Sequence, residues 1–274
     1  MASQFVPRPI TTMGAAQQIA EQIRAGIMRG ELAPGHRLPP EIELAAEYSV
    51  SRGTIRETMK LLSAQHLVES TRGAAGGTFV RLPEPENVAA TMGDSISLWF
   101  NAGSTSVAEV NAARAWIEHG CVLMAARTRD PGDVAQIRAA VEAMEAPGIA
   151  MDDMLALDID FHVAVCRAAR NAILELAMTA IHIVRPYTNT MLMPLLSIAT
   201  IAAQHRAIYE AIAAGDEVAA EAAFDAHIAH LAEVREQALA DQRAEDVRVG
   251  ALTHEAHPDF ERIRARVLER GGRD

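Results

Sequence analysis

Three histidines and one aspartate are the residues whose types and spacing best suit metal chemistry. Asp158 and His162 stand four residues apart in the segment LDIDFHVAVC, so a helix projects both side chains from one face. His205 and His227 lie in two later segments with helical patterns. Neutral imidazoles and a carboxylate are good ligands for a borderline divalent cation, so the four residues predict a site for Zn²⁺, with Ni²⁺ or Mn²⁺ as alternatives.

Each of these ligand candidates also has a plainer interpretation. A single histidine on a helix is more often a surface residue or a satisfied core residue than a ligand. Asp160 offers the same carboxylate group as Asp158, but only Asp158 shares a helix face with His162. The prediction therefore depends on whether the fold brings the three helices together.

Two arginines, Arg52 and Arg56, form the second group with a definable chemistry. They are four residues apart in a predicted helix that begins after Ser51, and they lie opposite its apolar residues. These apolar residues are Ile55, Met59 and Leu62. Arginine can bond guanine edges through two N–H groups, while Ser, Thr and backbone N–H groups hold phosphates. A solvated helix face is the alternative explanation for the two arginines.

The segments around these arginines predict a winged helix-turn-helix. A short helical pattern over residues 41–48 is followed by a three-residue turn and then the arginine-bearing helix, an arrangement that places the second helix in a DNA major groove. Two β-prone runs, 67–70 and 78–80, flank a glycine-rich turn and predict a hairpin, with Arg72 at its tip for a minor-groove or phosphate contact.

The stretch from Leu38 to Val80 resembles the DNA-binding domain of the GntR superfamily. The shared pattern is LP-x-E-x-EL-A, then VSR-x-T-x-RE, then LV and finally G-G-T-F-V. The chain departs from the family at Ile42, where members usually carry Arg, and at Gly53, where they often carry Thr or Ala. The resemblance implies DNA contacts by Ser51, Arg52, Thr54, Arg56, Arg72 and Gly73.

After residue 82 the sequence contains only helical patterns. The prolines of residues 83–87 predict a linker, and helices follow over about 88–100, 107–129, 133–145, 151–170, 171–191, 194–214 and 216–240. Short turns and the lack of strand signals predict an antiparallel bundle. The fold class is therefore mainly α, with a small β wing in the N-terminal part.

This helical part resembles the FCD effector domain of FadR-type GntR regulators. The matching residues are Glu109, Arg114, Glu118, Asp158, His162, Asn171, the segment from His205 to Asp216, and His227. Metal-containing members use one Asp and three His at these positions, which implies Asp158, His162, His205 and His227 as ligands. The resemblance also implies a small carboxylate effector clamped by Arg114, although an ion pair between Arg114 and Glu118 is equally consistent with the sequence. A further helix, which carries His182, Arg185, Tyr187 and Asn189, is expected to line the same pocket.

The charge of the 274-residue chain is unevenly distributed. Residues 1–82 hold 9 basic and 7 acidic residues, a net charge of +2, whereas residues 83–274 hold 16 and 29, a net charge of −13. Only the N-terminal part can therefore face nucleic acid, and a dimer would double its phosphate contacts on a palindromic site.

We divide the chain into a DNA-binding domain (1–82), a linker with a connecting helix (83–104), an FCD effector domain (105–240) and a charged tail (241–274). The tail forms either a short amphipathic helix or a disordered end.

The remaining features favour a cytoplasmic protein. Its two cysteines, Cys121 and Cys166, are expected to be reduced and buried. The sequence lacks a run of 18 apolar residues, and its N-terminus lacks the layout of a signal peptide.

Taken together, the motifs and the two resemblances lead us to expect a homodimeric, metabolite-responsive transcriptional regulator that binds a double-stranded operator. Members of this family are more often repressors than activators. The alternatives are a metal-dependent hydrolase attached to a DNA-binding domain, and a metal with a purely structural role.

Overall fold

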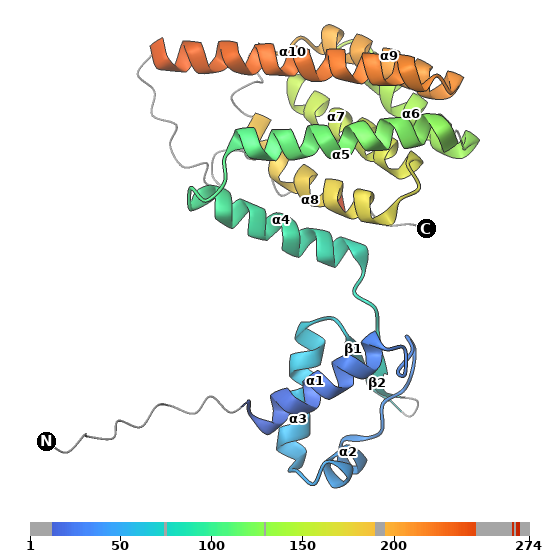
Figure 1. The fold of residues 1–274 in the computed structure, drawn as a ribbon, viewed down its shortest axis with the longest axis vertical. Helices are drawn as coiled ribbons and strands as arrows, with labels where there is room; N and C mark the ends of the chain where they lie inside the picture. Colours follow the sequence, from blue (N-terminus) through green and yellow to red (C-terminus); the bar gives the residue numbers. More distant parts are fainter. Residues whose placement is uncertain are drawn as a thin grey trace, which may run out of the picture. The chain divides into compact units, whose positions relative to one another are not determined.

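The computed structural model describes residues 13–73, 76–128, 130–189 and 195–244, together with residues 265, 267 and 268 (Figure 1). The chain divides into two compact units, Met1–Glu84 and Pro85–Asp274. Each unit has its own apolar core, so each can be described by itself.

The N-terminal unit is the predicted winged helix-turn-helix. It contains α1 (Ala15–Met28), α2 (Glu41–Glu47), α3 (Arg52–Ala64), β1 (Val68–Thr71) and β2 (Gly77–Val80). The strands are antiparallel, with Val68 opposite Val80 and Thr71 opposite Gly77. Helices α1 and α2 both pack on α3. The core between them is formed by Ile19, Ile23, Ile27, Leu38, Leu44, Ile55, Met59, Leu62, Val68 and Val80.

The C-terminal unit is a helical bundle. It contains α4 (Pro85–Asn101), α5 (Val107–Thr128), α6 (Pro131–Met144), α7 (Met151–Ala168), α8 (Ala172–Asn189), α9 (Ile198–Ala214) and α10 (Glu217–Ala244). Helix α5 packs against α7, α8, α9 and α10, and α4 packs against α8 (Figure 1). The described residues thus confirm a mainly helical fold with a two-stranded wing.

Local sequence explains where these helices begin and end. Asp130 caps α6, because its Oδ1 accepts a hydrogen bond from the Gly132 N–H at 2.9 Å. Gly215 ends α9 with a φ of 72°, a left-handed conformation that favours glycine. Asp216 then caps α10 by accepting a hydrogen bond from the Ala219 N–H at 3.0 Å.

The predicted linker over residues 83–87 is wrong in its second half, because α4 begins at Pro85. Proline resists a helix interior but suits the first turn, where its missing N–H has no acceptor and its fixed φ is already helical. Pro85 therefore marks the start of a helix, whereas Pro83 lies in the short non-helical connection before it.

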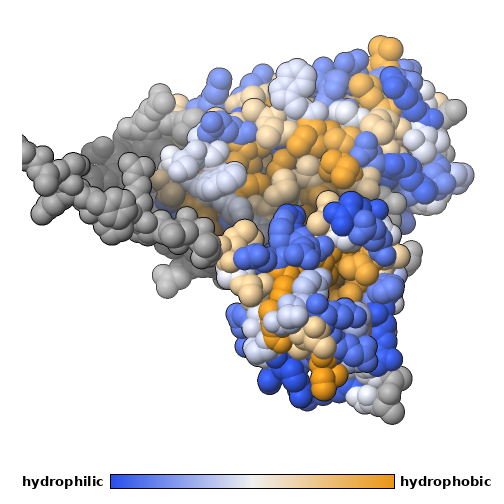
Figure 2. Space-filling view, turned by 60° about the horizontal axis from the view of Figure 1, so that its bottom comes forward, coloured by the Kyte–Doolittle hydropathy of each residue, from blue (hydrophilic) through white to orange (hydrophobic). Residues whose placement is uncertain are grey.

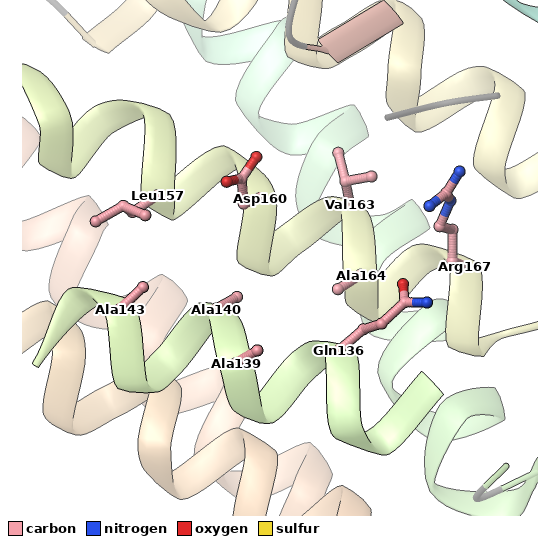
Figure 3. A pocket seen from close by; sticks show the side chains of 9 residues that line it. All are labelled: Gln136, Ala139, Ala140, Ala143, Leu157, Asp160, Val163, Ala164 and Arg167. Atoms are coloured by element: carbon pink, nitrogen blue, oxygen red, sulfur yellow. The ribbon is translucent and has the colours of Figure 1, made fainter. Parts of the chain in front are cut away.

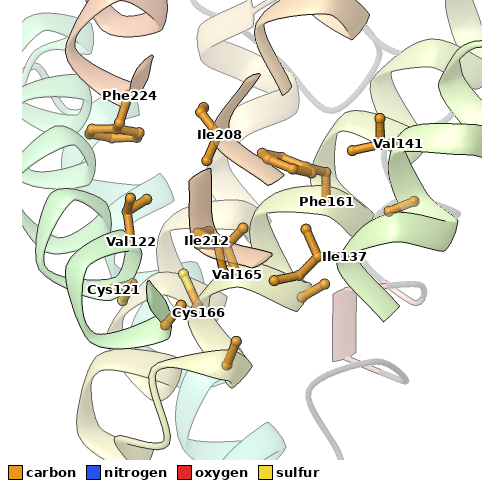
Figure 4. Close-up of a cluster of buried hydrophobic side chains, with 14 of the residues drawn as sticks. Cys121, Val122, Ile137, Val141, Phe161, Val165, Cys166, Ile208, Ile212 and Phe224 are labelled. Atoms are coloured by element: carbon orange, nitrogen blue, oxygen red, sulfur yellow. The ribbon is translucent and has the colours of Figure 1, made fainter. Parts of the chain in front are cut away.

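Both cysteines are free and buried, as predicted. Cys121 of α5 and Cys166 of α7 lie side by side in the bundle core (Figure 4). The contact with Cys121, together with burial, raises the pKa of the Cys166 thiol well above its usual value. Cys166 is therefore a packing group and not a reactive thiolate.

The C-terminal segment contributes to a second apolar cluster of the bundle. Val267 is helical and 1% exposed, and it packs with Leu155, Ile159 and Val163 of α7 and with Ile183 of α8. The helical alternative for the tail thus holds at the three positions described there. Among the described helices, none combines the length and apolar composition that crossing a lipid bilayer requires.

Gly93 lets α4 approach α8 closely. A Cβ at this position would lie 2.9 Å from both Cβ and Cγ2 of Ile183 and 3.1 Å from the Ala180 carbonyl oxygen. We expect Gly93→Ala to lower the free energy of unfolding by about 1–3 kcal/mol, the usual cost of overpacking. Gly120 on α5 is the matched control, since a Cβ there meets nothing within 4 Å and alanine favours a helix by up to about 1 kcal/mol. Urea unfolding of both variants checks this, and equal stability of the two would contradict it.

Candidate functional site

The first candidate site is the exposed face of α3. Ser51 precedes the helix, and its Oγ accepts a hydrogen bond from the Thr54 N–H at 3.1 Å and lies 2.9 Å from Thr54 Oγ1. This cap fixes the start of the helix. Because Ile55 and Leu62 are fully buried, the opposite face, with Arg52 and Thr54, points away from the core.

The two arginines of α3 differ in their surroundings. Arg52 is exposed and forms no ion pair with the residues that the structure describes. The Arg56 side chain is 63% exposed, and its Nε lies 3.7 Å from Glu41 Oε2 of α2. An exposed pair at this distance is weak, so Arg56 can exchange Glu41 for a phosphate or a base.

The wing carries the remaining predicted DNA contacts. Arg72 is exposed, and Gly73 has a φ of 113°, a conformation that favours glycine. Arg37 was not predicted to matter, yet its Nη2 donates a hydrogen bond to the Gly76 carbonyl at 2.6 Å. A Cβ on Gly77 would lie 2.6 Å from Arg37 Nε. Arg37 therefore supports the turn end of the wing, a role that no local pattern indicates.

The second candidate site is a buried histidine cluster in the bundle. His162 of α7, His205 of α9 and His227 of α10 each offer a ring nitrogen, and these atoms all lie within 4.8 Å of one another. All three residues are 0–1% exposed. The His205 ring stacks on Phe161, with centroids 4.0 Å apart and planes at 10°, which holds its orientation.

Asp158 lies at the edge of this histidine cluster. Its Oδ1 is 3.6 Å from both His162 Nε2 and His205 Nε2, and its Oδ2 pairs with the Arg185 guanidinium. Ligand atoms about 2.0–2.1 Å from a tetrahedral zinc ion are roughly 3.4 Å apart, so Asp158 Oδ1 lies at a suitable separation from two of the three histidines. Asp160 instead lines a cavity of about 250 Å³ between α6 and α7, together with Gln136, Ala140 and Arg167 (Figure 3).

Neighbouring side chains orient two of the imidazoles. His227 Nδ1 donates to the amide oxygen of Gln204 at 2.8 Å, which leaves its Nε2 lone pair free. His162 Nδ1 contacts the Glu118 carboxylate, which likewise leaves Nε2 toward the cluster. Such outer contacts fix the tautomer of metal-bound histidines.

The unsatisfied ring nitrogens test whether these residues fit a metal ion. Neither nitrogen of His205 has a hydrogen-bond partner among the described residues, and neither does His227 Nε2. Buried polar atoms without partners are rare and costly. A cation between the three imidazoles would satisfy these atoms, so the donor set fits a borderline divalent ion.

Two buried arginines adjoin the cluster. Arg114 Nε donates to Glu118 Oε2 at 3.0 Å, the ion pair that the sequence offered as one alternative, and Arg114 Nη2 lies 2.8 Å from His162 Nε2. Arg185 pairs with Asp158. His182 is fully buried, and its ring centroid is 6.1 Å from that of His162. The side chains of Tyr187 and Asn189 lie outside the described residues.

The charges of this region are set by burial and by pairing. Burial alone would raise the pKa of Glu118, but His162 and Arg114 hold it well below its usual value. The pKa of Asp158 is lowered in the same way by Arg185 and His162. Burial lowers the pKa of His227 to about 3, and burial also lowers the pKa values of His182 and His205. His182, His205 and His227 are therefore neutral at physiological pH, which is the form in which a histidine binds metal.

These shifts predict that the metal-free protein is labile to acid. Below pH of about 6.5 the unfolded chain takes up protons at His182, His205 and His227, whereas the folded chain does not. Stability is therefore lost as the pH falls, by up to about 1.4 kcal/mol per pH unit for each histidine. Urea unfolding of chelator-treated protein at pH 7.5, 6.5 and 5.5 measures this dependence. His182→Gln should reduce the slope by about one third, and a flat profile between these pH values would refute the prediction.

Comparison with known proteins matches both parts of the chain. Residues 109–230 match the FCD domain, and residues 15–80 match the gntR family of bacterial regulatory proteins. The HTH-type transcriptional regulator LutR of Bacillus subtilis is 29% identical over 218 residues, which cover 76% of this chain and 95% of LutR. The galactonate operon transcriptional repressor of Escherichia coli is 27% identical over 217 residues, which cover 77% and 93% of the two chains. A solved structure of Streptococcus agalactiae GntR has the same fold, with a TM-score of 0.53, 22% identity and coverage of 81% of this chain and 99% of that one.

Proposed function

Since the chain belongs to the GntR family of bacterial transcriptional regulators and carries an FCD domain, we propose that it binds an operator as a homodimer under the control of a divalent metal and a small carboxylate. Its family consists of DNA-binding regulators and not of enzymes, which removes the metal-dependent hydrolase from consideration. A regulator of transcription acts where the bacterial DNA is, so we place it in the cytoplasm.

The observation that carries the proposal is the set of unpaired imidazole nitrogens of His205 on α9 and His227 on α10, which lie within 4.8 Å of a ring nitrogen of His162 on α7. Asp158, His162, His205 and His227 would hold the metal, with Zn²⁺ as the first choice and Ni²⁺ or Mn²⁺ as alternatives. A bound metal ion would supply a Lewis-acidic position for a carboxylate oxygen. Arg114 would then exchange its contact with His162 for the second oxygen of that carboxylate. The galactonate operon repressor is named after a sugar acid, which is consistent with a carboxylate effector here.

Two features support a homodimer. The weak positive charge of residues 1–82 favours doubling the DNA contacts. Large apolar residues are also exposed on the bundle, among them Trp99 of α4, 59% exposed, and Trp116 of α5, 80% exposed. Figure 2 shows hydrophobic residues among hydrophilic ones on the face that it views. Exposed aromatic residues are typical of subunit interfaces.

The effector would act by linkage between two sites. A carboxylate that favours one arrangement of the bundle helices shifts DNA affinity by no more than its differential affinity for the two arrangements. Coupling of this kind usually amounts to about 5–150-fold. If the effector prefers the arrangement that binds DNA more tightly, it recruits the protein to the operator. If it prefers the other arrangement, it releases the protein from DNA.

The test begins with selection of a binding site from random duplex DNA by the zinc-loaded protein. We expect a palindromic site, because a two-fold dimer presents two copies of α3. Fluorescence anisotropy with this site is then measured against a panel of small carboxylic acids. At least one acid should change the DNA affinity by about fivefold or more, and Arg114→Gln should abolish this response while retaining DNA binding. If DNA binding changes neither on removal of the metal nor on addition of any acid, the proposed regulation is wrong and the metal has only a structural role.

A further inference from the structure

Two polar side chains near Arg114 have hydrogen-bonding groups that the protein leaves unused. The Nε of Arg235 on α10 and the Nδ2 of Asn111 on α5 are buried and have no hydrogen-bond partner among the residues that the structure describes. Arg235 is half-buried and forms no ion pair within the described part of the chain. Neither residue is explained by the metal ligands or by the clamp that Arg114 would provide. Arg235 also lies beyond residues 109–230, the segment that matches the FCD domain.

Asn111 and Arg235 each share a helix face with residues of the proposed metal site or with residues that contact it. Asn111, Arg114 and Glu118 stand at i, i+3 and i+7, so they share one face of α5. On α10 the spacing of His227, Leu231 and Arg235 is i, i+4 and i+8, and again a single face results.

The helices α5 and α10 run antiparallel, which brings these faces together (Figure 1). Arg127 near the end of α5 pairs with Glu217 at the start of α10, and His119 pairs with Glu221 one turn further along α10. Continuing this register, the first turns of α5 face the later turns of α10. Asn111 therefore lies toward Arg235, and both adjoin Arg114.

Charge at this end of the bundle is unbalanced. Burial, and after it the nearby charge of Arg114, lowers the pKa of the Arg235 guanidinium, and no carboxylate among the described residues offsets this effect. Glu118 is already engaged by Arg114 and His162. The neighbouring guanidinium groups of Arg114 and Arg235 repel each other, and an anion beside Arg235 would offset that repulsion.

We propose that the effector is a small diacid, whose first carboxylate meets the metal and Arg114 and whose second acidic group is bound by Arg235 and Asn111. This assignment rests on the proposed function. A monocarboxylic acid would place an apolar end against buried N–H groups and leave them without partners, which selects against it. Eight residues of helix separate His227 from Arg235, a rise of about 12 Å along α10. An effector with roughly four to six carbon atoms, together with the extended Arg235 side chain, spans this distance.

Matched acids of equal chain length provide the test. Calorimetric titration of the zinc-loaded protein compares succinate with butyrate, glutarate with pentanoate and adipate with hexanoate. In at least one pair we expect the dicarboxylate to bind about tenfold more tightly or better, because the second group satisfies Arg235 and Asn111. A further titration with 3-phosphonopropionate, set beside succinate, shows whether the second acidic group is better a carboxylate or a phosphoryl group.

Arg235→Gln should reduce this preference to less than about threefold while zinc content stays at the wild-type level. Arg127→Gln, which removes an exposed arginine of α5, is the matched control and should keep the preference. If Arg235→Gln does not fold, Asn111→Leu serves as the second variant and should weaken the dicarboxylate alone.

The outcomes separate the two proposals. Equal binding of mono- and dicarboxylates in all pairs, or a preference that survives Arg235→Gln, overturns the diacid assignment and leaves the carboxylate effector standing. Failure of every acid to bind the zinc-loaded wild type overturns the proposed function, and the diacid assignment with it.

Discussion

His205→Ala is expected to leave the purified protein with less than about a tenth of an equivalent of zinc per chain, against about one equivalent in the wild type. His205 is fully buried, and neither of its ring nitrogens has a hydrogen-bond partner in the described part of the chain. Alteration of an outer contact of a metal site usually weakens metal binding by about 10–100-fold, and loss of a direct ligand costs more. Elemental mass spectrometry of both proteins, prepared side by side, measures the difference.

Loss of the metal should also be visible in stability. A ligand that binds only the folded protein stabilises it by about 4 kcal/mol at a thousand times its Kd. Zinc should therefore raise the thermal midpoint of chelator-treated wild type and leave that of His205→Ala unchanged. Because the comparison is made within each protein, the cavity left by the shortened side chain does not enter the result.

A surface cluster provides the control for this experiment. His119, Glu221 and Asp225 also offer three ligand atoms within 4.8 Å of one another, but they are half-buried or exposed. His119→Ala should keep the full equivalent of zinc. If instead His119→Ala loses the metal and His205→Ala keeps it, the ion binds at the surface between α5 and α10, and the buried cluster is a polar core.

The sequence alone predicted the parts of this site that lie within one helix. The spacing of Asp158 and His162 indicates a shared face, and the structure places both beside His205. His205 and His227 reach the same point because of the way α9 and α10 pack in the bundle. The periodicity of the sequence does not encode how helices cross. The family resemblance, and not the spacing, supplied that step.

The supporting contacts of the histidines were not predictable from the sequence. Gln204 orients His227 across 23 residues, and Glu118 contacts His162 from a different helix. A glutamine next to His205, or a glutamate in the middle of a helix such as Glu118, looks like an ordinary surface residue in a sequence. Their roles become visible only through burial, because a buried polar group must find a partner.

Prediction of the fold failed where one residue type is common in two different kinds of local structure. The apolar residues of α3 and the glycines of the wing predicted their elements directly, because their periods are distinct. Pro85 was assigned to a linker, since proline disfavours helix interiors, yet it starts α4. Only the helix that follows distinguishes these two roles of proline.

Arg52→Ala is expected to weaken binding to the selected palindromic DNA by about 30-fold or more. Loss of one bidentate base contact costs about 1–3 kcal/mol, and a homodimer loses two of them. Arg52 suits this role because it is exposed at the first turn of α3 and has no ion pair to break among the described residues. Fluorescence anisotropy at fixed salt concentration measures the change.

The matched control removes an equal charge from another helix of the same unit. Arg29 follows α1 and donates from Nε to Glu31 Oε1 at 2.7 Å, so Arg29→Ala changes net charge without altering α3. We expect it to weaken binding by less than about threefold, since only the general attraction to phosphates is reduced.

Sequence and salt dependence then show what Arg52 contacts. If it contacts a base, Arg52→Ala relaxes the preference at one position of each half-site and leaves the salt dependence nearly unchanged. If it contacts a phosphate, affinity falls equally for all sequences, and the salt slope drops by about two, one for each subunit. A loss no greater than that of Arg29→Ala would mean that the exposed face of α3 is not the DNA-binding surface. The departures at Ile42 and Gly53 would then reflect a changed docking geometry and not merely an altered half-site.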